Sequence, residues 1–254
     1  MSAPALAVHG LVKTFGGVRA VDDVSFHAAP GELLALIGPN GAGKSTCFAC
    51  IGGQLKPNGG AVRLGERRID GLPPRRVWRH GVSRTFQIPG LFDSMTAAEC
   101  VQTALLSRAR RLLDAWRRAP RFQTGRARDL LARVDAAHLA ATPCGALAHG
   151  DAKRVELAVA LANDPGVLLL DEPTAGMAAA ERAALMDAAA AEARRHGRAV
   201  VFTEHDVDIV FTHADRVVVL DRGAVAADAA PDRVRRDPRV QRVYLGETEE
   251  TAPC

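Results

Sequence analysis

The stretch Gly38-Pro39-Asn40-Gly41-Ala42-Gly43-Lys44-Ser45-Thr46 matches the pattern G-x-x-x-x-G-K-[ST] at every required position. Small residues let successive backbone N–H groups wrap around phosphate oxygens, and the helix that follows points its positive dipole end at the same charge. We expect Lys44 to reach the β- and γ-phosphates and the Ser45 hydroxyl to ligate Mg²⁺. The nine residues together therefore predict a binding site for a nucleoside triphosphate.

The sequence on either side of this loop has the order that the motif requires. Residues 33–37 form a short apolar run typical of a buried parallel strand, and residues 45–54 contain no proline and can form a helix. A glycine-rich surface turn would need neither the preceding strand nor the Lys44-Ser45 pair. The context therefore favours phosphate binding over a plain turn.

Length and composition indicate an ordinary globular protein. The chain has 254 residues and a net charge of +4, enough for one large or two modest domains. No apolar run approaches the roughly 18 residues of a membrane span, and the first residues do not resemble a signal segment, so we expect a cytoplasmic protein. Five irregularly spaced cysteines argue against a disulfide framework, and we expect Cys47 and Cys50 to be packing residues.

Arginine is concentrated in one part of the chain. These side chains could form a surface for anionic lipid, nucleic acid or an acidic partner, or simply a solvated helical face. We favour the solvated face, because a run of charge is weak evidence by itself. The nine arginines lie at positions 108, 110, 111, 117, 118, 121, 126, 128 and 133.

The pattern of apolar residues divides the chain into three parts. Residues 5–37 predict a small antiparallel sheet that leads into the phosphate-loop strand, and residues 95–141 have the spacing of a helical insertion. After that, strands alternate with helices, which predicts a parallel sheet covered on both faces. The expected strands are 167–170, 199–203 and 216–220, and the expected helices are 155–162, 179–196 and 207–212.

A second acidic motif follows more than a hundred residues after the loop. The apolar run 167–170 ends in Asp171 and Glu172. In phosphate-loop enzymes such a strand places an Asp where it can hold Mg²⁺. Because side chains alternate along an extended strand, we expect Glu172 to point away from Asp171, towards an attacking water.

Taken together, these motifs resemble an ATP-binding cassette (ABC) ATPase subunit over nearly the whole chain. The resemblance implies a P-loop α/β core, with an N-terminal antiparallel β subdomain and a helical subdomain at about 88–160. It also implies a single nucleotide-binding domain over residues 1–254, with a C-terminal tail from about 229 to 254. ATP and Mg²⁺ are the implied cofactors, and ATP hydrolysis is the implied activity.

Leu147-Ala148-His149-Gly150-Asp151 resembles the signature segment of that family, ideally L-S-G-G-Q. In the family this segment closes over the nucleotide of a second cassette, so the resemblance implies a dimer, either of identical chains or of two paralogues. Residues 148–151, namely Ala148, His149, Gly150 and Asp151, would thus contact the partner's ATP.

Three more positions match family motifs. Phe15 matches the aromatic residue that stacks on adenine, and Gln87 matches the glutamine that contacts Mg²⁺ and water. His205 matches the switch histidine beside the γ-phosphate. The resemblance therefore implies catalytic roles for Glu172, His205, Lys44 and Gln87, and metal contacts for Ser45, Gln87 and Asp171.

The sequence also departs from the family pattern at three positions. Ala148 replaces the signature serine, Asp151 replaces the glutamine, and Ala178 stands where the segment after Glu172 usually ends in Asp. A lost polar contact can cost on the order of 1–3 kcal/mol, so contacts across the dimer are expected to be weaker. A subunit that senses ATP but scarcely hydrolyses it is therefore one alternative.

Two segments indicate the subfamily. The insertion around residues 112–120 is similar to ATPases of branched-chain amino acid importers, and the tail at 237–247 fits those as well as urea importers and lipopolysaccharide exporters. The resemblance implies two membrane permeases as partners, a periplasmic binding protein acting indirectly, and a place on the cytoplasmic face of the inner membrane.

The other alternative is a non-transport ABC ATPase that acts on nucleic acid. Such relatives usually carry two cassettes or a long coiled coil, so we expect no nucleic-acid partner.

Overall fold

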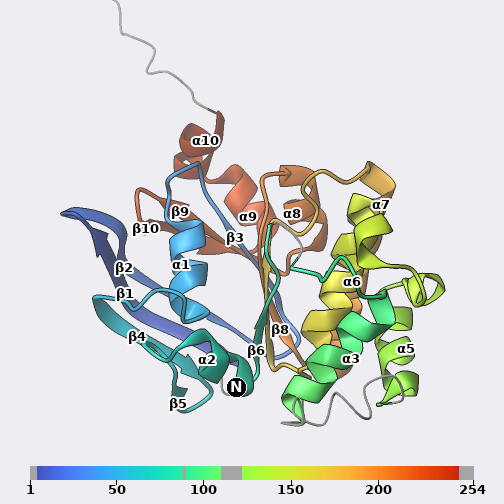
Figure 1. Ribbon diagram of the computed structural model, residues 1–254. Helices are drawn as coiled ribbons and strands as arrows, with labels where there is room; N and C mark the ends of the chain where they lie inside the picture. Colours follow the sequence, from blue (N-terminus) through green and yellow to red (C-terminus); the bar gives the residue numbers. More distant parts are fainter. Residues whose placement is uncertain (1–4, 88–89, 110–121, 246–254) are drawn as a thin grey trace, which may run out of the picture.

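The computed structural model describes residues 5–87, 90–109 and 122–245 of the chain (Figure 1). Residues 110–121, which include five of the nine clustered arginines and most of the insertion used to assign the subfamily, lie outside the described residues. So do residues 246–254 of the tail. No helix in the described ranges is both long enough and apolar enough to cross a membrane.

The N-terminal part forms a four-stranded antiparallel sheet, as the sequence predicts. Its strand order is β2-β1-β4-β5. The hairpin between the first two strands turns at Gly16 and Gly17, whose positive φ angles of 51° and 90° suit glycine. The strands are β1 (Leu6–Phe15), β2 (Val18–Ala28), β4 (Gly59–Leu64) and β5 (Arg67–Arg68).

The central sheet has six strands in the order β10-β9-β3-β8-β7-β6. All neighbouring pairs are parallel except β10 with β9, which form an antiparallel pair at one edge. This edge strand is absent from the sequence-based expectation because its alternation is weak. The strands are β3 (Leu33–Ile37), β6 (Val82–Arg84), β7 (Val167–Asp171), β8 (Ala199–Thr203), β9 (Arg216–Asp221) and β10 (Ala224–Ala229).

Both faces of this central sheet are covered, which is why its strands are apolar at successive positions. Along β3, Leu33, Ala35 and Ile37 pack into one hydrophobic cluster, and Leu34 and Leu36 pack into the other. The second cluster also contains Phe48 of helix α1 (Lys44–Ile51), which lies between the two sheets (Figure 1). The two clusters fix the end of β3, and therefore the start of the phosphate loop.

The helices of the expected insertion, and the helix that follows β7, lie on the other side of the central sheet from α1 (Figure 1). The expected insertion contains α3 (Ala97–Arg108), α5 (Thr124–Arg133) and the two 3₁₀ turns Ala137–Leu139 and Cys144–Ala146, and it leads into α6 (His149–Leu161). Helix α6 therefore begins six residues before the expected position, within the signature segment. The other helices are α2 (Pro74–Arg79), α7 (Ala179–His196), α8 (Val207–His213), α9 (Pro231–Arg236) and α10 (Pro238–Leu245).

Candidate active site

The candidate residues gather where parallel strands of the central sheet end. The phosphate loop follows β3, Arg84 ends β6, Asp171 ends β7 and Thr203 ends β8. Neighbouring parallel strands present their carboxyl ends at the same edge of a sheet, which is where open α/β sheets bind ligands. Residues more than a hundred positions apart in the sequence thus come together at one site.

At two positions, the phosphate loop has a backbone conformation that only glycine allows. Gly38 has a φ of +155°, and an added Cβ would lie 2.2 Å from the Leu220 carbonyl oxygen. Gly43 has a φ of +101°, and its Cβ would lie 2.4 Å from the Ala20 carbonyl oxygen. These two residues let the loop curl tightly before α1 begins at Lys44.

The start of helix α1 is open to an anion. Gly43 caps the helix without a side-chain hydrogen bond, and the first turn contains no acidic residue. The N–H groups of the first turn, which have no partner within the helix, therefore face the loop together with the positive end of the helix dipole. This is the arrangement that binds phosphate in other proteins.

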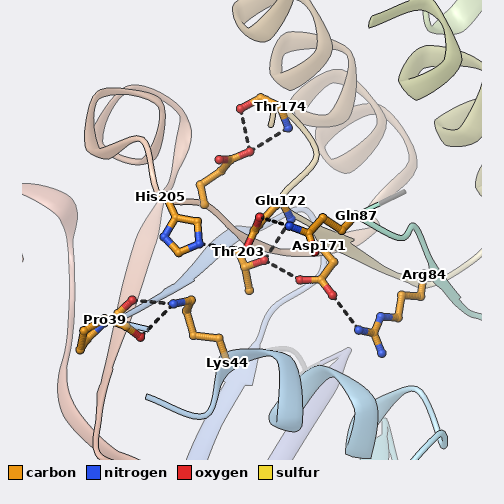
Figure 2. A network of polar contacts seen from close by, with 11 residues as sticks. Pro39, Lys44, Arg84, Gln87, Asp171, Glu172, Thr174, Thr203 and His205 are labelled. Carbon is orange, nitrogen blue, oxygen red and sulfur yellow. Dashed lines mark hydrogen bonds and ion pairs between the residues drawn. The ribbon is translucent and has the colours of Figure 1, made fainter. Parts of the chain in front are cut away.

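The side chain of Lys44 lies against its own loop. Its Nζ donates to the carbonyl oxygen of Gly38 at 2.6 Å and to that of Pro39 at 3.1 Å (Figure 2). Burial lowers the pKa of Lys44, while the negative charges of Glu172 and Asp171 act in the opposite direction. The two carbonyls use two of the three N–H donors of the ammonium group, which leaves one for a phosphate oxygen.

Most of the expected nucleotide contacts line one cavity of about 330 Å³. Phe15, 47% exposed, lies on its wall, as do Glu172 and His205. The loop residues that line it are Asn40, Gly41, Ala42, Gly43, Lys44, Ser45 and Thr46. A larger cavity of about 510 Å³ borders the loop through Pro39–Ala42, with Asp221, Arg222 and Arg242, but it contains neither Lys44 nor an acidic residue from β7. The smaller cavity therefore has the chemistry expected for a triphosphate.

Asp171 is held by two side chains from neighbouring strands. Its Oδ1 accepts from the Thr203 hydroxyl at 2.9 Å, and its Oδ2 accepts from the Arg84 guanidinium at 2.7 Å (Figure 2). Both charged side chains of the ion pair are nearly buried, 13% exposed for Arg84 and 12% for Asp171. Sequence reasoning missed Arg84 and Thr203 as site residues, although Arg84 directly precedes the Thr85-Phe86-Gln87 stretch and Thr203 precedes Glu204-His205.

The carboxylates of Glu172 and Asp171 are separated by a change of backbone conformation and not by the alternation of side chains along a strand. The strand ends at Asp171, and Glu172 adopts a left-handed φ of +46° instead of extended backbone. Its N–H donates to the Thr203 carbonyl oxygen at 3.2 Å, which holds this unusual conformation. The two carboxylates are therefore separated by a backbone turn, and the expectation of a simple strand alternation is wrong.

The carboxylate of Glu172 lies between two polar side chains. One oxygen, Oε2, accepts from the Gln87 amide at 3.0 Å, and the other is 2.9 Å from His205 Nε2 (Figure 2). The Glu172 side chain is only 16% exposed, whereas that of His205 is 51% exposed. Gln87, Glu172 and His205 thus form one contiguous group from three strand ends.

A second carboxylate follows β8, next to His205. Glu204 is 4% exposed, and its Oε1 accepts from both the N–H (2.8 Å) and the hydroxyl (2.7 Å) of Thr174. Burial raises the pKa of Glu204. The contact ties the segment after β7 to the segment after β8, so Glu172 and His205 are held relative to each other. The sequence alone gave no sign of this role.

The signature segment does not line either cavity described above. Ala148 caps helix α6, and the His149 ring Nε2 lies 2.9 Å from the Ala175 carbonyl oxygen in the segment that follows Glu172. A Cβ on Gly150 would lie 3.0 Å from the Glu181 carboxylate, which also accepts from the Ala178 N–H at 3.2 Å. Residues 148–151 therefore contact residues 175–181 of the same chain and are not at its phosphate loop.

The donor set fits a nucleotide with its magnesium ion. Gly38 and Gly43 allow a tight loop that a Cβ would prevent, Ser45 lines the cavity, and Asp171, which does not line it, supplies a carboxylate at the end of β7, next to Glu172. Hydroxyl and carboxylate oxygens are the ligands that Mg²⁺ prefers, usually together with substrate phosphates and water. Among the described residues there is no cluster of three or more His, Cys, Asp or Glu side chains that could hold a metal alone. The metal would thus depend on phosphate oxygens.

Comparison with known proteins also indicates an ATP-binding cassette. The family model described as ABC transporter matches residues 21–175, and the model described as branched-chain amino acid ATP-binding cassette transporter matches residues 224–250. The high-affinity branched-chain amino acid transport ATP-binding protein LivG of Salmonella typhimurium is 39% identical, over 97% of this chain and all of LivG.

Two solved structures are also similar. The ADP conformation of MJ1267, an ATP-binding cassette of an ABC transporter, superposes with a TM-score of 0.84 at 29% identity, over 97% of this chain and all of that one. A dimeric cassette, MJ0796, has a TM-score of 0.77 at 26% identity, over 89% of this chain and 98% of that one. ATP hydrolysis is the general activity of such cassettes. The chain therefore belongs to the ABC transporter family and is an ATP-binding, ATP-hydrolysing subunit.

Proposed function

We propose that this subunit powers the import of branched-chain amino acids through partner membrane permeases. The match of residues 224–250 to a branched-chain amino acid transporter model and the full-length similarity to LivG support this cargo. Support for the chemistry comes mainly from one observation, the Glu172 carboxylate held between Gln87 and His205 at the cavity that contains the phosphate loop.

In the proposed mechanism, the phosphate loop and helix α1 bind the triphosphate through backbone N–H groups. Lys44 would donate to the β- and γ-phosphates, while the Phe15 ring stacks on the base. Ser45, Asp171 and Gln87 would hold Mg²⁺, which when bound neutralises charge on the phosphates. Asp171 is oriented for this by Thr203 and Arg84.

Glu172 is proposed as the general base. One of its carboxylate oxygens would accept a proton from a water that attacks the γ-phosphorus in line with the departing ADP oxygen. His205 is on the exposed side of the carboxylate, where it can donate to the γ-phosphate oxygens. The Gln87 amide N–H donates to the Glu172 carboxylate and so holds its orientation.

We also propose that the site is completed by a second cassette. Residues Ala148–Asp151 lie away from the nucleotide cavity of their own chain, and they are the N-terminal turn of α6, where backbone N–H groups favour an anion. A partner's cavity would receive them. Closing and reopening of two such cassettes would drive the permeases between inward-facing and outward-facing states, on the cytoplasmic side of the membrane.

Uptake of radiolabelled leucine by cells tests the cargo. Replacing the native gene with a Lys44→Ala copy should abolish ATP-dependent leucine uptake while protein levels stay unchanged. The same cells should take up urea at the wild-type rate. Unchanged leucine uptake in the Lys44→Ala cells would overturn the proposed cargo, even if the purified protein hydrolyses ATP.

A further inference from the structure

Helix α6 contacts the backbone on both sides of Gln87 with a buried pair of charged residues. Lys153 is 3% exposed, and its Nζ donates to the carbonyl oxygens of Phe86 at 2.9 Å and Gln87 at 2.7 Å. Glu156, one helical turn further on and 6% exposed, accepts from the N–H of Phe86 at 2.9 Å and, more weakly, from that of Gly90 at 3.4 Å. The pair is thus bonded to the loop backbone at four points.

The four hydrogen bonds accompany the burial of two ionisable side chains. Taking two charged side chains out of water is unfavourable, and good hydrogen-bond geometry must offset that cost. Here each charge is directed to backbone groups of one short segment, and each bond has a charged partner. Burial lowers the pKa of Lys153 and raises that of Glu156 to about 7, as expected for groups taken out of water.

Among the described residues, one oxygen of Glu156 has hydrogen-bond partners and the other has none. Its Oε2 is buried and has no hydrogen-bond partner among the described residues. A buried acceptor without a partner costs free energy, so a residue that served packing alone would be better apolar. What the carboxylate provides at this position is an acceptor for the N–H groups of Phe86 and Gly90.

The same helix carries the signature segment at its other end. Ala148 caps α6, and Lys153 and Glu156 follow in its second and third turns. An α-helix is a stiff rod on this length scale, with its backbone bonds satisfied internally. A displacement of the signature end is therefore transmitted to the loop that carries Gln87.

We propose that Lys153 and Glu156 are positioning residues for ATP hydrolysis, which fasten the backbone around Gln87 to helix α6 so that Gln87 and the signature segment move as one unit. The inference rests on the proposed role of Gln87 beside Glu172. It means that a movement of α6 also moves Gln87, which in this structure donates to the Glu172 carboxylate at 3.0 Å.

A double-mutant cycle between Glu156 and Gln87 tests this coupling. Glu156→Ala removes the acceptor of two backbone N–H groups, and we expect kcat to fall about tenfold, the equivalent of about 1.4 kcal/mol, while KM for ATP stays within about twofold. In a Gln87→Ala background the same change should lower kcat less than about twofold, because the residue that it positions is already gone. Glu156→Gln keeps an acceptor oxygen and should stay within about threefold of wild type.

Glu192→Ala is the matched control. Glu192 is a buried carboxylate of similar exposure, 4%, and is paired with Arg198 far from Gln87 in the sequence. It should lower thermal stability, and its effect on kcat should be the same in the wild-type and Gln87→Ala backgrounds. If Glu156→Ala does not fold, Lys153→Met, which removes both bonds to the loop carbonyls, takes its place in the cycle.

Amide hydrogen exchange without nucleotide provides a readout that is independent of turnover. Glu156→Ala should speed exchange at Phe86 and Gly90 at least about tenfold, with Glu192→Ala leaving both amides at the wild-type rate. Equal falls in kcat in both backgrounds, or a rise in KM in place of a fall in kcat, would overturn the positioning role alone. A wild-type kcat for Gln87→Ala itself would overturn the role of Gln87, and the inference with it.

Discussion

The ion pair between Arg84 and Asp171 allows the most quantitative prediction. The two charged groups are 2.7 Å apart and only 13% and 12% exposed, and the planar edge of Arg84 also packs over the Phe48 and Phe86 rings. Arg84→Met preserves the apolar stem but leaves Asp171 with Thr203 as its only hydrogen-bond donor among the described residues. Removing one partner of a buried ion pair costs about 3–5 kcal/mol, because the other charge stays uncompensated.

For a chain of this size that loss corresponds to a fall in Tm of about 6–20 °C. The assay is thermal unfolding by circular dichroism, without nucleotide. Arg108→Met is the control, because its pair with Asp164 is 39% and 51% exposed and such surface pairs contribute little. Its Tm should stay within about 2 °C of wild type.

The double variant Arg84→Met with Asp171→Asn separates the charge from the packing. Neutralising Asp171 removes the uncompensated charge, so most of the lost Tm should return. A Tm for Arg84→Met within about 2 °C of wild type would refute the argument that this pair is effectively buried. No recovery in the double variant would show that packing of the guanidinium, and not its charge, is what matters.

Three further predictions concern pH, thiols and the signature segment. Burial raises the pKa of Glu156 from 4.5 to about 7, so the folded protein binds an extra proton and loses stability as pH rises. Denaturant titrations should show wild type losing about 3 kcal/mol more than Glu156→Gln between pH 4.5 and 7, and parallel curves would refute the shift. Burial also raises the pKa of Cys47 and Cys144 to about 12, so peptide mapping after iodoacetamide at pH 8 should find both labelled only in urea. Finally, Ala148→Ser with Ala178→Asp should raise kcat a few-fold, on the order of 1 kcal/mol of recovered contact, and an unchanged kcat would show that these two residues do not limit turnover.

Much of the fold follows from local sequence features. The apolar runs at 33–37, 167–170 and 199–203 identify strands of the central sheet, because strands buried on both faces must be apolar at successive positions. Helix α7 has the expected bounds of 179–196, since Gly197 with its left-handed φ of 62° ends it. The edge strand β10 was missed, and the apolar pattern alone put the start of α6 six residues late, because neither has a strong local signal.

The candidate site was predictable only where a motif identifies it. Lys44, Asp171 and Glu172 stand out because glycines and an apolar strand precede them. Arg84, Thr203, Lys153 and Glu156 act through contacts between strands or helices that are 30 to 90 positions apart in sequence, as Arg84 with Asp171 shows. Residues whose role is to hold another residue are specified by the tertiary structure and carry no signature of their own.

Glu172, held by Gln87 and His205, is proposed as the base for ATP hydrolysis. The most direct measurement is phosphate release by purified wild-type and Glu172→Gln protein at saturating ATP and Mg²⁺, together with ATP affinity. Glutamine keeps the shape and one acceptor oxygen but cannot take up the proton, so kcat should fall by about 10²–10⁴-fold while ATP still binds. Hydrolysis by Glu172→Gln at the wild-type rate would contradict the account.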